Sequence, residues 1–225
     1  KSSSVPYQQE FAFEHHGMPV LYPATVSEFL EYGLHAAELS RYSGCWVALK
    51  LVGALCDGGE VVHFRPDQFK VITPKLNING KPFKKVANHK FFPVFNVETE
   101  RQLYVERHAA ALAYIKANNL NRITVSGGVR VAKIGALCPL DHDFVREFAR
   151  GLKKLIVVEE KRDFLERQIG RAVCEIGPMR IVGKFDEDGQ ILFPQEGGMN
   201  SDMVAVLLSR ALAKDINLPA PSGCR

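Results

Sequence analysis

The apolar positions from Val129 to Asp186 switch twice from strand spacing to helix spacing and back. A β-branched run over Val129–Ile134 predicts a strand. Asp141 can N-cap the helix that follows, because Phe144, Val145 and Phe148 fall at helical spacing and Gly151 stands just past its end. The continuous apolar run Leu155–Val158 is typical of a strand covered on both faces.

A second helix is predicted from Asp163 to Cys174, followed by a third strand that starts at Ile181 and Val182. Its apolar positions form one stripe: Phe164, Leu165, Ile169 and Val173. Strands that alternate with helices of this length imply right-handed crossovers. The predicted fold class is therefore α/β, built from parallel-sheet units.

An earlier β-α-β unit is predicted near the start of the chain. Met18–Tyr22 is a short strand, and Thr25 with Glu28 forms a capping box for a helix that runs to about Leu39. The apolar strand Cys45–Val52 follows. The side chains predicted to be buried on the helix are Val26, Phe29, Leu30, Leu34 and Ala37.

Residues 56–98 differ in character, since prolines and glycines interrupt every regular pattern. Val61-Val62 and Val71-Ile72 are candidate short strands, and Asn79-Gly80 marks a hairpin tip. This composition predicts a linker or covering arm. The Cys56–Gly59 cluster lacks the Gly-Asp-Gly order and the downstream asparagine of a magnesium motif, so it is rejected as a metal site.

Thr99 with Gln102 predicts a second capping box, which opens a helix over Glu100–Asn118. A strand over Asn121–Val125 follows, and the turn Ser126–Gly128 then leads into Val129. Strands joined by so short a turn would have to be antiparallel. This conflicts with the parallel pattern around them.

After Asp186 the pattern predicts a turn, a short strand over Ile191–Phe193 and a last helix N-capped by Asn200 or Ser201. The apolar face of this helix is Met203, Val204, Leu207, Leu208 and Leu212. At the other end of the chain, a helix is predicted over Gln9–His16.

The composition is that of an ordinary globular protein, with 46% hydrophobic and 24% charged residues. A net charge of +4 is too small and too scattered for a nucleic-acid surface, and no apolar run reaches the length of a membrane span. Five widely spaced cysteines indicate reduced thiols, with no spacing for zinc or an iron–sulfur cluster. No signal peptide is evident, so we expect a cytoplasmic protein.

Two acidic residues are the best candidates for chemistry. Glu159 and Glu160 end a predicted parallel strand, which is where ligands bind in open α/β sheets. One of them could be an acid with a raised pKa. Pairing with the adjacent Lys161 and Arg162 explains the charges equally well, so no catalytic residue is assigned.

Other constellations are weaker. Asp141, His142 and Asp143 could form an acid/base pair, although helix capping is the favoured interpretation. Ser126-Gly127-Gly128 is a small phosphate-loop candidate. Lys1, Ser2, Ser3 and Ser4 could contact phosphate, and they are retained with Glu159 as candidate cofactor-binding residues.

Four motifs resemble a known family: KSSSVPYQQE, SRYSGCWVALK, LIVVEEKR and VGKFDEDG. They are similar to the large subunit of indolepyruvate ferredoxin oxidoreductases, thiamine-diphosphate enzymes of the 2-oxoacid:ferredoxin oxidoreductase group. The resemblance implies that residues 1–55 are the tail of a pyrimidine-type thiamine-diphosphate domain. It also implies that residues 99–196 are a transketolase C-terminal-like domain, with residues 197–225 as a terminal helix and tail.

By the same resemblance, the parent enzyme decarboxylates a 2-oxoacid to an acyl-CoA with thiamine diphosphate and Mg²⁺, and iron–sulfur clusters pass electrons to ferredoxin. The family carries a further strand–helix unit near Ser126–Val129, so a missing segment is expected there. We expect an internal fragment that makes assembly and homodimer contacts, is inactive alone and binds no cofactor or metal by itself. The alternative is a stand-alone dimerisation or small-ligand-binding module.

Overall fold

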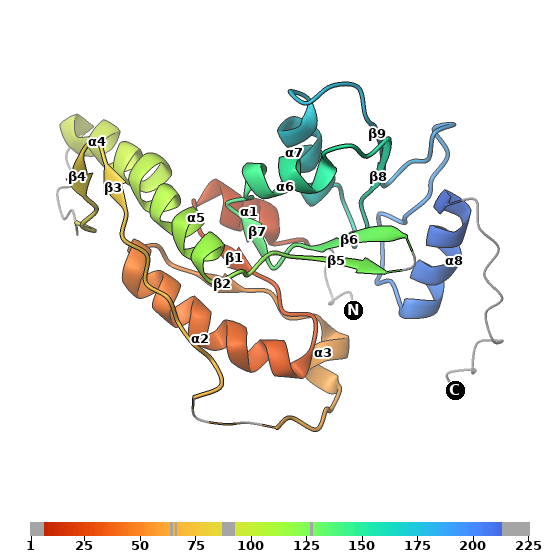
Figure 1. Cartoon of the computed structure of the whole chain (residues 1–225), viewed down its shortest axis with the longest axis horizontal. Helices are drawn as coiled ribbons and strands as arrows, with labels where there is room; N and C mark the ends of the chain where they lie inside the picture. Colours follow the sequence, from red (N-terminus) through yellow and green to blue (C-terminus); the bar gives the residue numbers. More distant parts are fainter. Residues whose placement is uncertain (1–6, 64, 66, 87–92, 127, 213–225) are drawn as a thin grey trace. The chain divides into compact units, whose positions relative to one another are not determined.

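A computed structural model describes residues 7–63, 65, 67–86, 93–126 and 128–212 (Figure 1). Its contacts divide the chain into two compact units. The first, called here the N-terminal unit, comprises residues 9–141. The second, the C-terminal unit, comprises residues 142–225 together with residues 1–8. The domain boundaries expected from the sequence stay predictions.

The predicted β-α-β unit near the start of the chain is confirmed. Strand β1 (Val20–Leu21) pairs in parallel with β2 (Ala48–Leu49), and helix α2 (Val26–Ser43) connects them. Both strands are shorter than predicted. Strand β7 (Ala136–Cys138) pairs antiparallel with β1, which gives the order β2-β1-β7. Helix α1 (Glu10–His15) precedes β1, as predicted.

The first three backbone N–H groups of α2 all donate to side-chain acceptors. The Thr25 hydroxyl accepts the Glu28 N–H at 3.1 Å, as the capping box predicts. The Glu28 carboxylate accepts the N–H of Ala24 at 2.7 Å, one residue before the reciprocal position of that box. The carboxylate of Glu60 accepts the N–H groups of the first two helical residues. The helix ends at Ser43, one turn later than predicted, before Gly44 at φ 77°.

The predicted buried face of α2 is wrong. Phe29, Leu30 and Leu34 are exposed, as is the smaller Ala37. The helix instead buries Tyr32, His35 and Leu39, together with Ser43. Hydrophobic spacing alone missed this face because two of its members are polar and find hydrogen-bond partners in the interior.

The partner of α2 is one long helix in three parts: α4 (Asn96–Arg101), the π-helical η2 (Gln102–Arg107) and α5 (His108–Ala117). It follows a 3₁₀ turn, η1 (Pro93–Phe95). The core between α2, α5 and the small sheet is Leu21, Tyr32, Leu39, Ala111, Tyr114, Ile115, Leu120 and Ala136.

The capping box predicted at Thr99 is wrong, since the helix begins at Asn96, four residues before the predicted start at Glu100. Thr99 lies inside the helix and its hydroxyl donates to the Phe95 carbonyl at 3.0 Å. The predicted end is confirmed at Asn118. The Asn118 amide also exchanges hydrogen bonds with the backbone N–H and C=O of Ile72, at 2.7 and 2.8 Å. The predicted covering arm is thereby joined to α5.

Within this arm, the predicted hairpin is confirmed as β3 (Asn77–Ile78) and β4 (Lys81–Pro82). Asn79 and Gly80 take positive φ values of 51° and 76°, as the tight turn requires. A short helix α3 (Gly53–Asp57) was not predicted. The candidate strands at Val61-Val62 and Val71-Ile72 do not form.

Strands β5 (Arg122–Ser126) and β6 (Val129–Lys133) form an antiparallel hairpin, with Ser126 paired to Val129. The antiparallel pairing that so short a connection requires is therefore confirmed, and the parallel pattern of the neighbouring elements does not extend to this pair. The two-residue connection between them is sufficient for an antiparallel pair, with Gly128 at φ 76°. The missing segment that the family resemblance implies at this place stays a prediction.

The C-terminal unit has the predicted order of elements, except that the strand predicted over Ile191–Phe193 is wrong: only an isolated bridge between Phe185 and Ile191 forms there. It comprises α6 (His142–Ala149), β8 (Lys154–Ile156), α7 (Phe164–Val173), β9 (Arg180–Val182) and α8 (Ser201–Leu212). Strands β8 and β9 are parallel, with Leu155 opposite Ile181. The predicted stripe on α7 is confirmed as buried. The apolar run Leu155–Val158, which overlaps β8, is less buried than predicted, because Val158 is exposed.

Two local predictions in this unit are confirmed. The turn after Asp186 forms, because the Asp186 carboxylate accepts the N–H of Asp188 at 3.0 Å and of Gln190 at 2.8 Å. Asn200 caps α8 by accepting the Met203 N–H at 2.8 Å. Of the predicted α8 face, Leu207 and Leu208 pack on the cluster around Phe193, whereas Met203 is exposed.

The fold is thus mixed α/β with small sheets, of two or three strands among the described residues. Asp141, the predicted cap of α6, is buried and pairs with Lys116 at 3.4 Å; its capping role stays a prediction. Within the described ranges, no helix is both long and apolar enough to cross a membrane.

Gly135→Ala should destabilise the N-terminal unit by about 3 kcal/mol, because a methyl group would lie 2.1 Å from the Leu120 carbonyl oxygen and 2.2 Å from the Tyr32 hydroxyl. Urea unfolding measures the change. Gly59→Ala is the matched control, since an added Cβ there meets nothing within 4 Å. Equal midpoints for the two variants would contradict the close packing at Gly135.

Candidate functional site

Glu159 is the candidate cofactor-binding residue that lies within the described part of the chain, and its side chain caps the start of a helix. Its two carboxylate oxygens accept the N–H groups of Leu165 at 2.7 Å and Glu166 at 2.9 Å, at the first turn of α7. Burial raises the pKa of Glu159, against the two N–H donors and the Lys184 charge, which lower it. The raised pKa agrees with the sequence interpretation, but both oxygens are already engaged with the backbone.

The second residue of the pair is also engaged with the backbone, because the Glu160 carboxylate accepts the Met199 N–H at 2.9 Å. Glu166 accepts the N–H of Lys184 at 2.8 Å. Its carboxylate lies so close to Gly183 that an added Cβ would meet it at 2.2 Å. These three carboxylates hold the chain around β9 and α7, so their arrangement is that of a structural network.

Lys184, which the sequence analysis missed, is the buried cation of this network, with a residue exposure of 2%. Its ammonium group donates to the carbonyl of Glu159 and, at 3.4 Å, to that of Pro194. Burial lowers the pKa of Lys184, while the surrounding carboxylates, Glu159 first, oppose the shift. The only sequence signal was a lysine placed directly after a predicted strand.

The candidates Lys1, Ser2, Ser3 and Ser4 lie outside the described residues. The described chain begins at Tyr7, whose carbonyl accepts from the Lys161 ammonium at 2.9 Å. The Gln8 side chain accepts the Arg162 N–H at 3.1 Å. The segment that follows the serines is therefore attached to the loop after Glu159 and Glu160.

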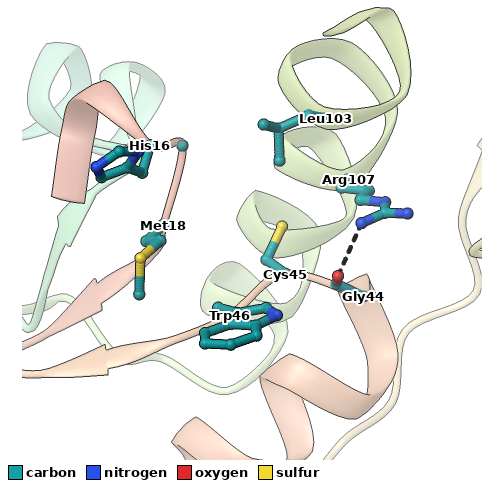
Figure 2. A pocket seen from close by; sticks show the side chains of 8 residues that line it. His16, Met18, Gly44, Cys45, Trp46, Leu103 and Arg107 are labelled. Carbon is teal, nitrogen blue, oxygen red and sulfur yellow. Dashed lines mark hydrogen bonds between the residues drawn. The ribbon is translucent and has the colours of Figure 1, made fainter. Parts of the chain in front are cut away.

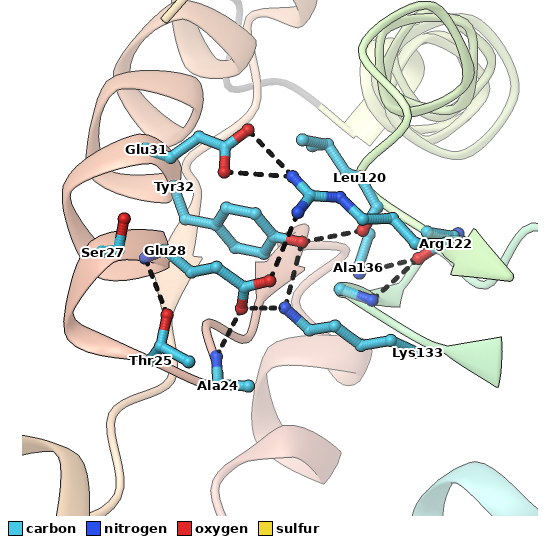
Figure 3. Close-up of polar contacts among 12 residues, drawn as sticks. Ala24, Thr25, Ser27, Glu28, Glu31, Tyr32, Leu120, Arg122, Lys133 and Ala136 are labelled. Carbon is cyan, nitrogen blue, oxygen red and sulfur yellow. Dashed lines mark hydrogen bonds and ion pairs between the residues drawn. The ribbon is translucent and has the colours of Figure 1, made fainter. Parts of the chain in front are cut away.

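A polar cluster in the N-terminal unit, shown in Figure 3, joins α2 to the β5–β6 hairpin. Arg122 donates to both carboxylate oxygens of Glu31, at 2.9 and 3.0 Å, and Lys133 donates to Glu28. The Lys133 ammonium also lies 4.6 Å from the centre of the Tyr32 ring. Two carboxylates from one helix thus meet two cations from two strands. The sequence did not reveal these pairs, because their members are about 90 to 105 residues apart.

The charged groups in this cluster shift one another's pKa values. Burial favours the neutral form of Glu28, but hydrogen bonds from Lys133 and the Ala24 N–H, with the charges of Lys133 and Arg122, lower the pKa of Glu28 overall. Burial lowers the pKa of Lys133, against its bond to Glu28. Burial, with the Glu28 charge, raises the pKa of Tyr32. The phenol therefore remains a neutral hydrogen-bond donor.

The N-terminal unit also has a pocket of about 290 Å³, shown in Figure 2. Its lining comes from three segments: His16–Met18, Gly44–Trp46, and Leu103 with Arg107 on η2. Arg107 donates to the Gly44 carbonyl at 3.0 Å and to the Val86 carbonyl at 2.5 Å. Trp46 is 81% exposed at its edge. The π-helical segment η2 positions Leu103 and Arg107, which form the third part of the pocket lining.

The chemistry of this pocket is limited. Burial raises the pKa of the Cys45 thiol, although a bond to Ser43 and the Arg107 charge oppose it, so the thiol is protonated at neutral pH. No carboxylate lines the pocket, so the lining does not fit a magnesium–diphosphate group, which needs oxygen ligands. Across the described ranges, no group of three or more His, Cys, Asp or Glu side chains could hold a metal ion.

The family model and the curated relatives that match this chain point to the same protein family. A family model described as an indolepyruvate oxidoreductase domain matches residues 102–218, which is more than half of the chain. This chain belongs to the indolepyruvate oxidoreductase domain family. The match contains Glu159, Glu160 and Lys184, and it begins within η2.

Two curated relatives carry the name "Indolepyruvate oxidoreductase subunit IorA". The protein of Methanothermobacter marburgensis is 28% identical over 192 residues, covering 75% of this chain and 31% of the relative. That of Methanothermobacter thermautotrophicus is 28% identical over 174 residues, covering 68% of this chain and 28% of the relative. The chain therefore spans about a third of the length of these relatives. No solved structure matches it.

Glu28→Gln should remove a pH-dependent part of the stability. The lowered pKa of Glu28 means that its contribution is complete above the unfolded-state pKa, about 4.3, and is lost as pH falls through the folded-state pKa. We expect the variant to be about 2 kcal/mol less stable at pH 7, with the difference shrinking below about pH 4. Urea unfolding from pH 3 to 7 measures it.

Glu100→Gln is the control for this pH dependence, because Glu100 is exposed on α4 in the same unit. A constant difference between wild type and Glu28→Gln across the whole pH range would contradict an ionised, paired Glu28.

Glu159→Ala should expose the first turn of α7. The expected cost is about 1–2 kcal/mol of unfolding free energy, with faster amide hydrogen exchange at Leu165 and Glu166, whose donors lose their acceptor. Glu147→Ala, at an exposed position of α6, is the control. Unchanged exchange at both amides would show that Glu159 is not the helix cap.

Proposed function

We propose that this chain is part of a 2-oxoacid:ferredoxin oxidoreductase of the indolepyruvate, or aryl-pyruvate, type, and that it serves assembly and dimer contacts within that enzyme. The observation that carries the proposal is the family match over more than half of the chain. The greater length of the two subunit IorA relatives supports a larger parent with further domains or subunits.

In the proposed parent, a 2-oxoacid is oxidatively decarboxylated to an acyl-CoA, and the electrons pass through iron–sulfur clusters to ferredoxin. Thiamine diphosphate, held with Mg²⁺, supplies the stabilisation of the carbanion that decarboxylation requires. We assign no residue of this chain to these groups, because the pocket lining lacks oxygen ligands for the metal. As part of the same proposal, residues 1–55 belong to a pyrimidine-type thiamine-diphosphate domain and residues 99–196 form a transketolase C-terminal-like domain. The proposed location of the protein is the cytoplasm.

The contacts of the acidic residues support a role in assembly. Glu159, Glu160 and Glu166 each accept backbone N–H groups, and Glu28 and Glu31 are paired with cations. A general acid or base needs a free oxygen within reach of a substrate proton. These carboxylates are engaged in holding helices and strands together, which is the chemistry of a scaffold.

A second candidate function is a stand-alone dimerisation or small-ligand-binding module. The pocket beside Trp46 favours it, since a cavity of about 290 Å³ is close to the lower limit for small-molecule sites. The family match is more specific than this cavity, and the first function is therefore preferred.

The full-length parent should reduce ferredoxin or a viologen dye with indolepyruvate or phenylpyruvate in the presence of coenzyme A, whereas the isolated 225-residue chain should not. Anaerobic spectrophotometry measures both rates. Dye reduction by the isolated chain that depends on a 2-oxoacid would overturn the inactive-fragment part of the proposal.

Titration calorimetry of the isolated chain with thiamine diphosphate and Mg²⁺ complements the assay. No heat of binding is expected, since we place these sites elsewhere in the parent. Micromolar binding would reveal a complete cofactor site in this chain. A parent that is inactive with every aryl-pyruvate tested would contradict the proposed substrate class.

A further inference from the structure

One side of α2 carries an uncharged stripe that the rest of the described structure covers only in part. Its three large side chains, Phe29, Leu30 and Leu34, are 38%, 42% and 39% exposed. Ala37 continues the stripe one turn on and is also exposed. Gly33 lies in its middle, and an added Cβ there would meet nothing within 4 Å. We call these five residues the outer stripe of α2.

The helix cannot rotate to bury this stripe within the chain, because its opposite side is fixed. Tyr32 and His35 are buried and hydrogen-bonded to Leu120 and Tyr114, at 2.8 and 3.0 Å. Glu28 and Glu31 hold one flank through the polar cluster. Rotation would leave several buried polar groups without partners, at about 1–3 kcal/mol each.

The composition of the outer stripe is not that of a solvated helix surface. Solvent-facing positions on helices are normally charged or polar, yet these five positions over more than two turns carry no charge. Bulky residues flank Gly33 and Ala37, and small residues at this spacing let a second helix approach closely. The stripe therefore has the form of a helix-packing surface.

The area of the stripe favours a partner from the same assembly over a second copy of this chain. Its three large side chains are already more than half covered, whereas a stable interface between separate proteins buries about 800 Å² on each partner. A segment connected covalently to this chain needs far less area, because the connection supplies a high effective concentration. The relatives have about two thirds of their length outside the matched region.

We propose that the outer stripe of α2 is the docking surface for an apolar helix from another part of the parent polypeptide. The inference rests on the proposed function, which makes this chain a part of a longer protein. It assigns α2 two roles: one face forms the core of the N-terminal unit, and the other joins that unit to the remainder of the enzyme.

Cysteine accessibility tests the proposal. The exposed Cys56 and Cys174, with Cys224, are first replaced by serine, which leaves the buried Cys45 and Cys138. Leu34→Cys is then introduced into the isolated chain and into the full-length parent, and its reaction with a maleimide is followed. We expect rapid labelling in the isolated chain and labelling at least about tenfold slower in the parent, as for a site that opens only transiently.

Two variants serve as controls. Thr73→Cys, at an exposed position outside the stripe, should label at similar rates in both proteins. Leu30→Cys should repeat the behaviour of Leu34→Cys. Circular dichroism of the isolated variants and the 2-oxoacid activity of the parent variants establish that each protein is folded.

Equal labelling of Leu34→Cys in the isolated chain and in an active parent would overturn the docking proposal and leave the proposed function intact. Protection that appears in the isolated chain at high concentration and vanishes on dilution would also overturn it, since a second copy would then be the occupant. An inactive wild-type parent would instead contradict the proposed function, whatever the labelling rates are.

Discussion

The hydroxyl of Tyr32 and the carbonyl of Leu120 form the buried contact on which the N-terminal unit depends. They are 2.8 Å apart, and Gly135 packs against both. This contact joins α2 to the segment between α5 and β5, and the Asn121 side chain holds the neighbouring turn by accepting the N–H groups of Gly135 and Ala136. Because an unpaired buried carbonyl is costly, the rotation of α2 about its axis is determined here. The exposed apolar stripe on the helix is a consequence.

Charged side chains in both units serve the same purpose. In the N-terminal unit, Glu60 and Glu28 satisfy N–H groups at the start of α2, where the helix dipole favours negative charge. In the C-terminal unit, Glu159 does the same for α7. These carboxylates stand at positions that also suit an active site in an α/β fold, and their hydrogen bonds distinguish the two interpretations. The candidate chemistry of Glu159 and Glu160 is thus better understood as architecture.

Membership of the indolepyruvate oxidoreductase domain family agrees with this architecture. The resemblance rested on short motifs such as LIVVEEKR, and the structure explains why such a motif is specific. Its two glutamates bind backbone amides, its lysine contacts Tyr7, and its arginine contacts Gln8. Glu159, Glu160 and Lys161 each bind a backbone group and Arg162 binds the Gln8 side chain, so a substitution at any of the four would break a defined contact.

The sequence by itself determined the local features: the capped start of α2, the buried stripe of α7, the Asn79-Gly80 hairpin and the Asn200 cap. Each depends on residues a few positions apart. Only the tertiary structure decided which face of α2 is buried and that β7 pairs antiparallel with β1. It also decided that Lys184 is enclosed. The burial of α2 depends on partners 79 to 105 residues away along the chain, and local periodicity carries no information about contacts over such separations.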